Sequence, residues 1–421
     1  MTQNSNETVG QTLGQAVGES LDQPVANARR YASLDILRGA AVLAIFVVNI
    51  KGMLAPFSWY GNASLWPGQW DMSIATLQAF LIDDKWRTIF TALFGAGLIL
   101  IAEKTAAAGG NPIKRMATRN GWLLAFGLFH LMFIWMGDIL TAYALTGFVA
   151  MTFWNKSVKF LTVWAISILI VAYFWMSLVN LAPFFSEQAR AQMKPIMWVP
   201  DAKELQLMYE LYFDSSVLEQ VIKRSGDAVM FLLFFVIAGG FGAATLGVML
   251  MGMVLWKTGF LKGELTTKTY LKYAVIGLSI AVVTDAGRWI ALMRTDWAFD
   301  TFVLGNLTNY FNGLAGGFGF ASLLMAIVRS GATLAPLAAV GRMAFTNYIL
   351  CSLIGTTLAF DHGAGLFMKL TLAQLMGIVA VTWLGLMVFS MLWLSIFRFG
   401  PLEWLWRSLS YGQLQPVFRR R

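Results

Sequence analysis

The feature that most constrains this chain is the recurrence of long apolar segments separated by short polar ones. The first, Ile36–Ile50, contains only Arg38 and Asn49 as strongly polar residues. Apolar segments of roughly 17–25 residues have the length of a transmembrane helix. Only 13% of the residues are charged, whereas a soluble domain carries about 25%. We therefore predict an all-α fold, a polytopic transmembrane helical bundle.

The apolar pattern predicts about ten spans and a short amphipathic helix at 74–83. The spans are expected at 36–54, 87–103, 120–136, 139–154, 158–180, 228–256, 271–293, 307–328, 343–360 and 371–396. Four basic residues lie in the loop 104–119, which the positive-inside rule places in the cytoplasm. An even number of spans then puts both termini in the cytoplasm, and the predicted location is the bacterial inner (cytoplasmic) membrane.

The same pattern divides the chain into five regions. They are a disordered cytoplasmic tail at 1–29, membrane helices at 30–180, an outer-surface amphipathic insert at 181–227, a membrane domain at 228–412 and a basic tail at 413–421. Within the insert, the helical recurrence of apolar residues is interrupted at Asp214-Ser215-Ser216. This interruption favours two short helices over one.

Composition excludes several classes of function. The net charge of +9 does not indicate nucleic acid, because the basic residues gather in the predicted cytoplasmic loops. Membrane lipids are the expected partners, and a homo-oligomer is left open. One cysteine, Cys351, excludes an intramolecular disulfide, and two histidines disfavour a His-rich metal site, so no metal is expected. The chain lacks the GxxxxGK[ST], HExxH and GxSxG motifs of ATP-driven pumps and of zinc and serine hydrolases.

Polar side chains within the apolar segments are the candidate functional residues. Asp35 and Arg38 are three residues apart, so they share a helix face and can pair, with Ser33 as a candidate cap. The alternative is that this pair only anchors the helix at the membrane surface. Asn49 lies near the opposite surface, where it would line a cavity.

A histidine and an aspartate define a second candidate site. His130 lies in an apolar segment and Asp138 follows eight residues later. A histidine in a membrane helix is expected to be neutral and hydrogen-bonded, and near a carboxylate it would suit general-base chemistry. The alternative is a packing histidine, for which Tyr143 is a candidate partner.

Two charged groups are expected near the outer surface. Lys85 and Arg87 open the second span and are interpreted first as interfacial anchors. Asp285 and Arg288 have helical spacing, which favours a structural salt bridge, with a pair lining a transport pathway as the alternative. An amide stripe follows at Asn306, Asn309 and Asn312.

The last two spans are bordered by arginines on the predicted cytoplasmic side. Arg342 opens the segment GRMAFTNY, which also holds Asn347, and Glu403 and Arg407 lie in GPLEWLWR. One ion-pair cluster of Arg342, Glu403 and Arg407 is the favoured interpretation. The alternative is a phosphate site, because guanidinium forks match phosphate oxygens.

Five stretches together resemble the YeiB-like bacterial membrane proteins, the family of domain of unknown function 418. They are SLDILRGAAVLAIFVVN, the run KWR before LFG, the segments GLFH and GDIL with the following YA, and the two segments GRMAFTNY and GPLEWLWR. The resemblance spans most of residues 30–412. The first stretch is also similar to the first helix of the lysosomal heparan-sulfate acetyltransferase family.

The second resemblance implies a transmembrane acyltransferase. Arg38, Arg342 and Arg407 would bind the phosphates of cytosolic acyl-CoA, and His130 would act as base beside Asp138. Asn49 retains the amide of that family, but the first outer loop, 52–75, has no histidine where the enzyme's active-site histidine lies. The acceptor would be an envelope lipid or glycan. The alternative function is a non-ATP-driven transporter or lipid-handling protein without catalysis.

Overall fold

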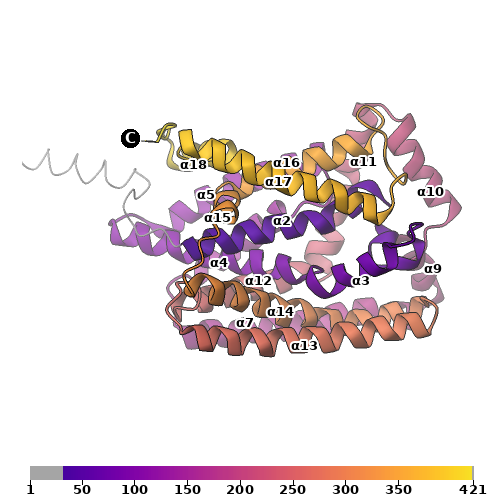
Figure 1. The fold of residues 1–421 in the computed structure, drawn as a ribbon, viewed down its shortest axis with the longest axis horizontal. Coiled ribbons are helices and arrows are strands. Elements are labelled where there is room, and N and C mark those ends of the chain that lie inside the picture. The colour runs from indigo at the N-terminus through magenta and orange to yellow at the C-terminus, as the bar shows by residue number, and fades with distance from the viewer. Residues whose placement is uncertain (1–31, 420–421) are drawn as a thin grey trace, which may run out of the picture.

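A computed structural model describes residues 32–419, except for the side chains of residues 234 and 235. The predicted tail at 1–29 and the last two arginines lie outside the described residues. Figure 1 shows the long helices running side by side along one axis. The first half comprises α2 (Ala32–Leu54), α3 (Asp71–Leu81), α4 (Lys85–Ala107), α5 (Pro112–Phe129), α6 (Leu140–Ala150), α7 (Val158–Asn180), α8 (Ala182–Phe185), α9 (Glu187–Met197) and α10 (Ala202–Tyr209). The second half comprises α11 (Val217–Met230), α12 (Phe241–Lys257), α13 (Thr267–Arg294), α14 (Phe299–Arg329), α15 (Ala335–Arg342), α16 (Ala344–Ala359), α17 (Leu372–Ile396) and α18 (Pro401–Tyr411).

The helices have the length and composition of a membrane protein. Six are long and apolar enough to cross a bilayer, or up to eight if each of two bent pairs counts as one span. Within residues 32–419 the regular structure is helical apart from one isolated antiparallel bridge between Phe397 and Phe418. The all-helical membrane class is therefore confirmed, whereas ten spans and the cytoplasmic position of both termini stay predictions.

Local sequence explains where the predicted boundaries hold and where they fail. The predicted spans 158–180 and 371–396 coincide with α7 and α17 to within a residue. The span predicted at 228–256 contains a break, because the chain bends by 61° between α11 with its π-helical extension and α12. Gly240 there has φ +82°, a left-handed conformation that favours glycine. The predicted interruption in the insert is present, and Ser216 begins α11 with a capping box.

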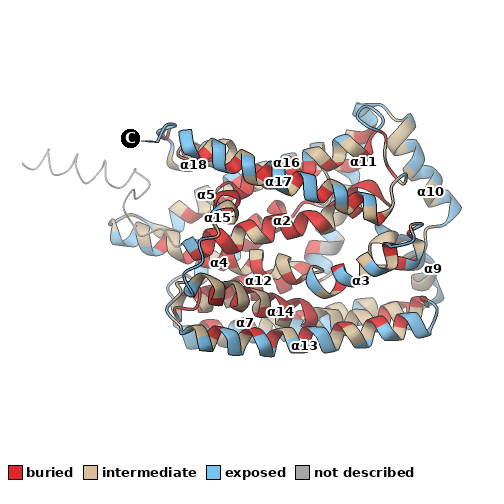
Figure 2. Ribbon diagram, viewed as in Figure 1, coloured by how far each residue is buried: buried red, intermediate tan, exposed pale blue. Residues whose placement is uncertain are grey.

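The first apolar helix forms the centre of the bundle. In its most apolar window 78% of α2 is buried, against 28% for α13 and α17 and 17% for α7. Figure 2 shows the same contrast, with α2 mostly buried and α13 and α17 exposing one side to the surroundings. The exposed apolar faces of the outer helices are those expected to contact lipid. The first apolar segment of the chain, which forms α2, is therefore also the core of the fold.

Two glycines allow α2 and α15 to cross in direct backbone contact. A Cβ atom added at Gly39 would overlap the carbonyl oxygen of Leu337, and one added at Gly341 would overlap that of Asp35. Small residues permit such close approach between membrane helices. Because Arg38 precedes one glycine and Arg342 follows the other, the crossing brings both arginines to the same place.

The helices α4 and α12 cross in the same way. A Cβ at Gly95 would overlap the carbonyl oxygen of Met249, and one at Gly252 would overlap that of Ala92. These contacts fix α4 against its neighbours, and α4 forms one wall of the site described below.

We predict that Gly341→Ala destabilises the protein, because neither backbone at the crossing can move away from the new methyl group. The expected loss is about 1–3 kcal/mol of unfolding free energy, the usual range for overpacking. Gly377→Ala on α17 is the matched control, since a Cβ there meets no atom within 4 Å. Thermal unfolding in detergent should show a lower midpoint for Gly341→Ala only. Equal midpoints would contradict the tight crossing.

Candidate functional site

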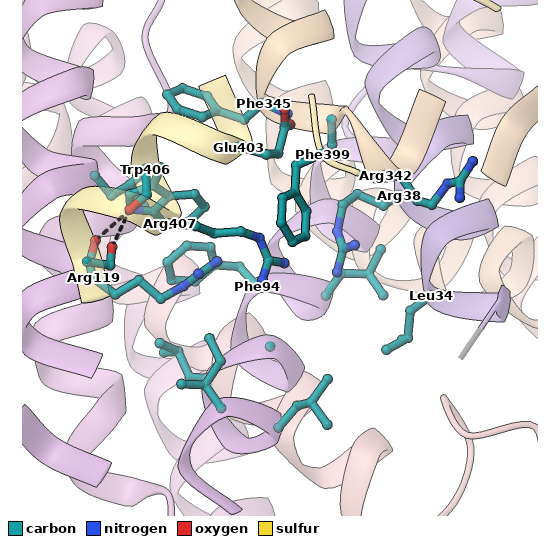
Figure 3. Close-up of a pocket in the computed structure, with 18 of the residues that line it drawn as sticks. Leu34, Arg38, Phe94, Arg119, Arg342, Phe345, Phe399, Glu403, Trp406 and Arg407 are labelled. Carbon is teal, nitrogen blue, oxygen red and sulfur yellow. Dashed lines mark hydrogen bonds between the residues drawn. The ribbon is translucent and has the colours of Figure 1, made fainter. Parts of the chain in front are cut away.

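A basic cavity lies at the end of the bundle where α2 begins and α18 is found. Its volume is about 480 Å³, and α2, α4, α5, α6, α15, α16 and α18 contribute to its walls. Figure 3 shows Arg38, Arg119, Arg342 and Arg407 around this hollow, from four different helices. The full set of basic residues lining it is Arg38, Lys104, Arg115, Arg119, Arg342, Arg398 and Arg407. The structure therefore brings together Arg38, Arg342 and Arg407, the three arginines that the acyltransferase resemblance implied would bind phosphate.

The two carboxylates of the cavity have partners of their own. Asp35 Oδ1 accepts a hydrogen bond from Arg38 Nη1 at 3.1 Å, as the helical spacing predicted. Glu403 accepts hydrogen bonds from the backbone N–H groups of Phe345 (2.7 Å) and Thr346 (3.1 Å) and from the Thr346 hydroxyl (2.6 Å). Glu403 thus caps the N-terminus of α16. The sequence predicted an ion-pair cluster of Arg342, Glu403 and Arg407 and did not predict this capping role. Among the described residues that line the cavity, two carboxylates stand beside seven basic side chains.

Three guanidinium groups stack on aromatic rings beside α18. The pairs, with distances from guanidinium carbon to ring centroid, are Arg115–Tyr411 (4.1 Å), Arg119–Trp406 (3.8 Å) and Arg407–Phe399 (4.6 Å). Arg119 precedes the apolar part of α5. Burial and the neighbouring positive charge of Arg407 lower the pKa of Arg119 to about 9. The concentration of positive charge here favours an anionic ligand. Sequence reasoning did not single out Arg119, whose only signal was its place in a basic loop.

The far end of the cavity is apolar and aromatic. Phe90, Leu140, Tyr143 and Tyr348 are among its lining residues. The hydroxyl of Tyr143 is hydrogen-bonded to the hydroxyl of Thr91 on α4. The sequence made Tyr143 a candidate partner of His130. Its hydroxyl is hydrogen-bonded to α4 instead, because α4 and α6 pack against each other here. A ligand with a charged end and an uncharged end would match this division.

His130 and Asp138 are joined directly. His130 Nδ1 lies 2.9 Å from Asp138 Oδ1, and Asp138 Oδ2 accepts a hydrogen bond from the Thr141 backbone N–H at 2.6 Å. The other ring nitrogen, Nε2, is buried without a hydrogen-bond partner among the described residues. With Nδ1–H donated to Asp138, Nε2 carries the lone pair, which is the tautomer that a general base requires.

His130 lies one side chain behind the cavity wall. Its ring centroid is 5.2 Å from that of Tyr348, which lines the cavity, whereas neither His130 nor Asp138 does. Asn49 is also outside the lining, roughly 20 Å from Asp35 along α2 at 1.5 Å per residue. The structure therefore brings the arginines together and places His130 behind Tyr348 in the cavity wall, whereas Asn49 lies far from Arg38 along α2.

A second group of polar residues forms a buried polar cluster between α4, α13 and α14. Lys85 is fully buried, and its Nζ lies 3.0 Å from Asp285 Oδ2. Asn312 Nδ2 donates to Asp285 Oδ1 at 2.7 Å. Asn309 Nδ2 donates to Asp84 Oδ2 at 2.8 Å, and Arg87 binds the other oxygen of that carboxylate. Buried charges need such partners, so the cluster is a fixed part of the fold.

Three predictions for polar residues need correction. Lys85 is not an interfacial anchor, because its side chain is fully buried in the protein and paired with Asp285 of α13. That ion pair also replaces the predicted Asp285–Arg288 bridge. Ser33 is not a helix cap, since its hydroxyl donates to the Leu261 carbonyl. Local spacing could not reveal long-range partners in any of these cases.

Asn347 has a packing role in the structure. Its Nδ2 donates to the Val340 carbonyl at 3.2 Å and to the Ser390 hydroxyl at 2.9 Å. It therefore ties α16 to α15 and α17. In the described part of the chain no group of three or more His, Cys, Asp or Glu side chains is placed to hold a metal ion.

Fold and site together define a polytopic helical membrane protein with a basic cavity at one end. The chain belongs to the YeiB-like family. It is 32% identical over 405 residues to "Uncharacterized protein YeiB" of Escherichia coli (strain K12), covering 93% of this chain and 99% of that relative. It is 29% identical over 416 residues to "Uncharacterized protein YxaH" of Bacillus subtilis (strain 168), covering 94% and 98%.

The profile described as "Protein of unknown function (DUF418)" matches residues 255–413, which include α13 to α18. No solved structure matches this chain. The predicted family is therefore confirmed, and the names of these relatives state no activity.

We predict that Lys85→Met destabilises the protein by about 3–5 kcal/mol, because it leaves a buried aspartate without its counter-charge. The double variant Lys85→Met/Asp285→Asn removes both charges and should recover a large part of the loss. Denaturant or thermal unfolding in detergent measures both. A double variant as unstable as the single one would contradict the direct pairing of Lys85 with Asp285.

Proposed function

We propose that this protein is an inner-membrane acyltransferase that takes an acyl group from cytosolic acyl-CoA and delivers it to an acceptor in the cell envelope. The observation that carries the proposal is the convergence of arginines from α2, α5, α15 and α18 on one cavity whose two carboxylates are already engaged. Such a site selects a ligand with several negative charges. Guanidinium forks match phosphate oxygens in particular.

The cavity also suits the remaining parts of the donor. Its volume of about 480 Å³ lies within the usual range of roughly 300–1,000 Å³ for small-molecule sites. The stacked rings and guanidinium groups beside α18 offer flat surfaces for an aromatic base. The aromatic far end would receive the uncharged thioester end.

His130 is the proposed base, with Asp138 as its positioning residue. Once Tyr348 moves aside, Nε2 takes the proton from the acceptor hydroxyl or amine as the acceptor oxygen or nitrogen attacks the thioester carbonyl. The new C–O or C–N bond forms, the C–S bond breaks, and the leaving thiolate of coenzyme A takes the proton from the His130 imidazolium, which returns to its neutral form. Asp138 stabilises the imidazolium that exists between these steps.

The proposed orientation follows from charge. Lys104, Arg115, Arg398 and Arg407 lie around the cavity, Lys257 ends α12, and Lys262 lies in the turn before α13. Positive residues concentrate on the cytoplasmic side of membrane proteins. The cavity would then open to cytosolic donor, with α9 and α10 on the opposite, outer side (Figure 1).

The second candidate function is a transporter without catalysis. The observation that favours it is the buried Lys85–Asp285 ion pair with Asn312, because charged groups inside a membrane often mark a pathway. The acyltransferase is preferred because Asp285 and Arg288 do not line the basic cavity. Two assays separate these functions. Transfer of radiolabel from acyl-CoA to envelope extract indicates an acyltransferase, and uptake of solutes into proteoliposomes indicates a transporter.

We predict that Arg342→Gln and Arg407→Gln each weaken coenzyme A binding about 10- to 100-fold, the effect of losing one hydrogen bond to a charged group. Titration calorimetry of the detergent-solubilised protein measures the affinity. Arg190→Gln, which removes a partly exposed arginine paired with Asp300 outside the cavity, is the matched control. Coenzyme A affinity that is unchanged in both cavity variants would remove the donor from this site.

We predict that His130→Ala abolishes acyl transfer while coenzyme A binding stays within about twofold, because the imidazole lies behind the cavity wall rather than in it. Radiolabelled acyl-CoA with purified protein and bacterial envelope extract measures transfer, and retained coenzyme A binding shows that the variant is folded. Transfer at the wild-type rate would exclude His130 as the base.

A further inference from the structure

The wall of the basic cavity contains a neutral amide that the fold leaves without a partner. Asn120 of α5 lines the cavity and is only 1% exposed. Its Nδ2 is buried and makes no hydrogen bond within the described part of the chain. An unpaired buried donor costs stability, because it loses its hydrogen bonds to water and gains none in return. An unpaired amide in a cavity wall therefore indicates that a bound molecule supplies the partner.

The surroundings of this amide are apolar. Met116 and Leu123, about one helical turn before and after Asn120 on α5, are buried in the hydrophobic core. A Cβ atom added at Gly147 of α6 would lie 2.9 Å from Asn120 Nδ2 and 3.1 Å from Phe94 Cε1. Asn120 thus lies where α4, α5 and α6 meet. A neutral partner suits such surroundings better than an ion, because an ion there would lose its hydration.

Asn120 lies between the basic end of the cavity and its aromatic far end. The preceding residue, Arg119, stacks its guanidinium on the Trp406 ring at 3.8 Å (Figure 3). Phe94, which adjoins Asn120, is roughly 15 Å from Lys104 along α4. On its other side the Phe94 ring lies 5.5 Å from the ring of Tyr143. A ligand with phosphates among the arginines and an uncharged end at Tyr143 therefore passes Asn120.

The chemistry of a carboxamide defines what can pair with it. The side chain of asparagine has N–H donors at one end and a carbonyl acceptor at the other, and rotation about the Cβ–Cγ bond exchanges the two ends. Its best match is a second amide, which also has both groups. A phosphate only accepts hydrogen bonds, and a thioester has no N–H. In coenzyme A, the segment between the phosphates and the sulfur is the pantetheine arm, which contains amide groups.

We propose that Asn120 is a specificity-determining residue whose side-chain amide pairs with an amide of the pantetheine arm of bound acyl-CoA. This inference rests on the proposed function, to which it adds the residue that distinguishes coenzyme A from other phosphorylated nucleotides. The arginines select negative charge, which every nucleotide carries. Asn120 selects the neutral arm and, by holding it, directs the thioester toward Tyr143 and Tyr348.

The test compares two ligands by titration calorimetry of the full-length protein in detergent. Coenzyme A contains the arm, whereas adenosine 3′,5′-diphosphate has the same nucleoside and the 3′-phosphate without the arm. Asn120→Leu replaces the amide by an apolar group of similar size. We expect it to weaken coenzyme A binding about tenfold, because an amide of the ligand loses its partner, and to leave adenosine 3′,5′-diphosphate binding within about twofold. Asn180→Leu, at the end of α7 and outside the cavity lining, is the matched control and should change neither affinity.

Thermal unfolding of the same samples without ligand separates recognition from packing. Because Asn120→Leu removes an unpaired buried amide, its unfolding midpoint should equal or exceed that of the wild type. Asn120→Ala, which removes the amide without adding bulk, carries the binding test where the leucine variant does not fold.

The inference is overturned if the Asn120 variants bind coenzyme A as the wild type does, or if they lose affinity for both ligands to the same extent. In either case wild-type binding of coenzyme A would leave the proposed function intact. A wild-type protein that binds adenosine 3′,5′-diphosphate and coenzyme A equally would also overturn the inference alone. A wild-type protein that does not bind coenzyme A would defeat the donor proposal and this inference together.

Discussion

The site depends on the backbone contact between α2 and α15. Gly39 and Gly341 face each other with no room for a side chain, and an arginine adjoins each glycine in sequence. Because the crossing is fixed by backbone atoms rather than by flexible side chains, the spacing of Arg38 and Arg342 is fixed as well. The charge of the cavity is thus a consequence of how the core helix packs, which links α2 to the proposed chemistry.

The two polar regions of the bundle follow opposite electrostatic rules. The buried polar cluster holds its charges in pairs, as low-dielectric surroundings require. The basic cavity lies at the end of the bundle, where water can solvate a surplus of positive charge, and an anion can replace that water. The helix α4 contributes residues to both regions.

Sequence reasoning succeeded where short-range periodicity decides the structure. Apolar length predicted the helices, the three-residue spacing predicted the Asp35–Arg38 pair, and the motif resemblance predicted the family. It failed where a partner comes from far along the chain, as for Lys85 with Asp285 or Ser33 with Leu261. It also failed at Gly240, since four nearby glycines indicated close packing without revealing which one bends the chain. The grouping of Arg38, Arg342 and Arg407 came from the resemblance, because helical periodicity alone does not state which helices are neighbours.

The measurement that tests the account most directly is an experimental density map of the protein in a lipid nanodisc with bound acyl-CoA. The account predicts phosphate density between the guanidinium groups of Arg38, Arg342 and Arg407, with the acyl end near Tyr143 and Tyr348. Density for the donor elsewhere, or a cavity closed by side chains or filled by a lipid tail while donor is in excess, would contradict it.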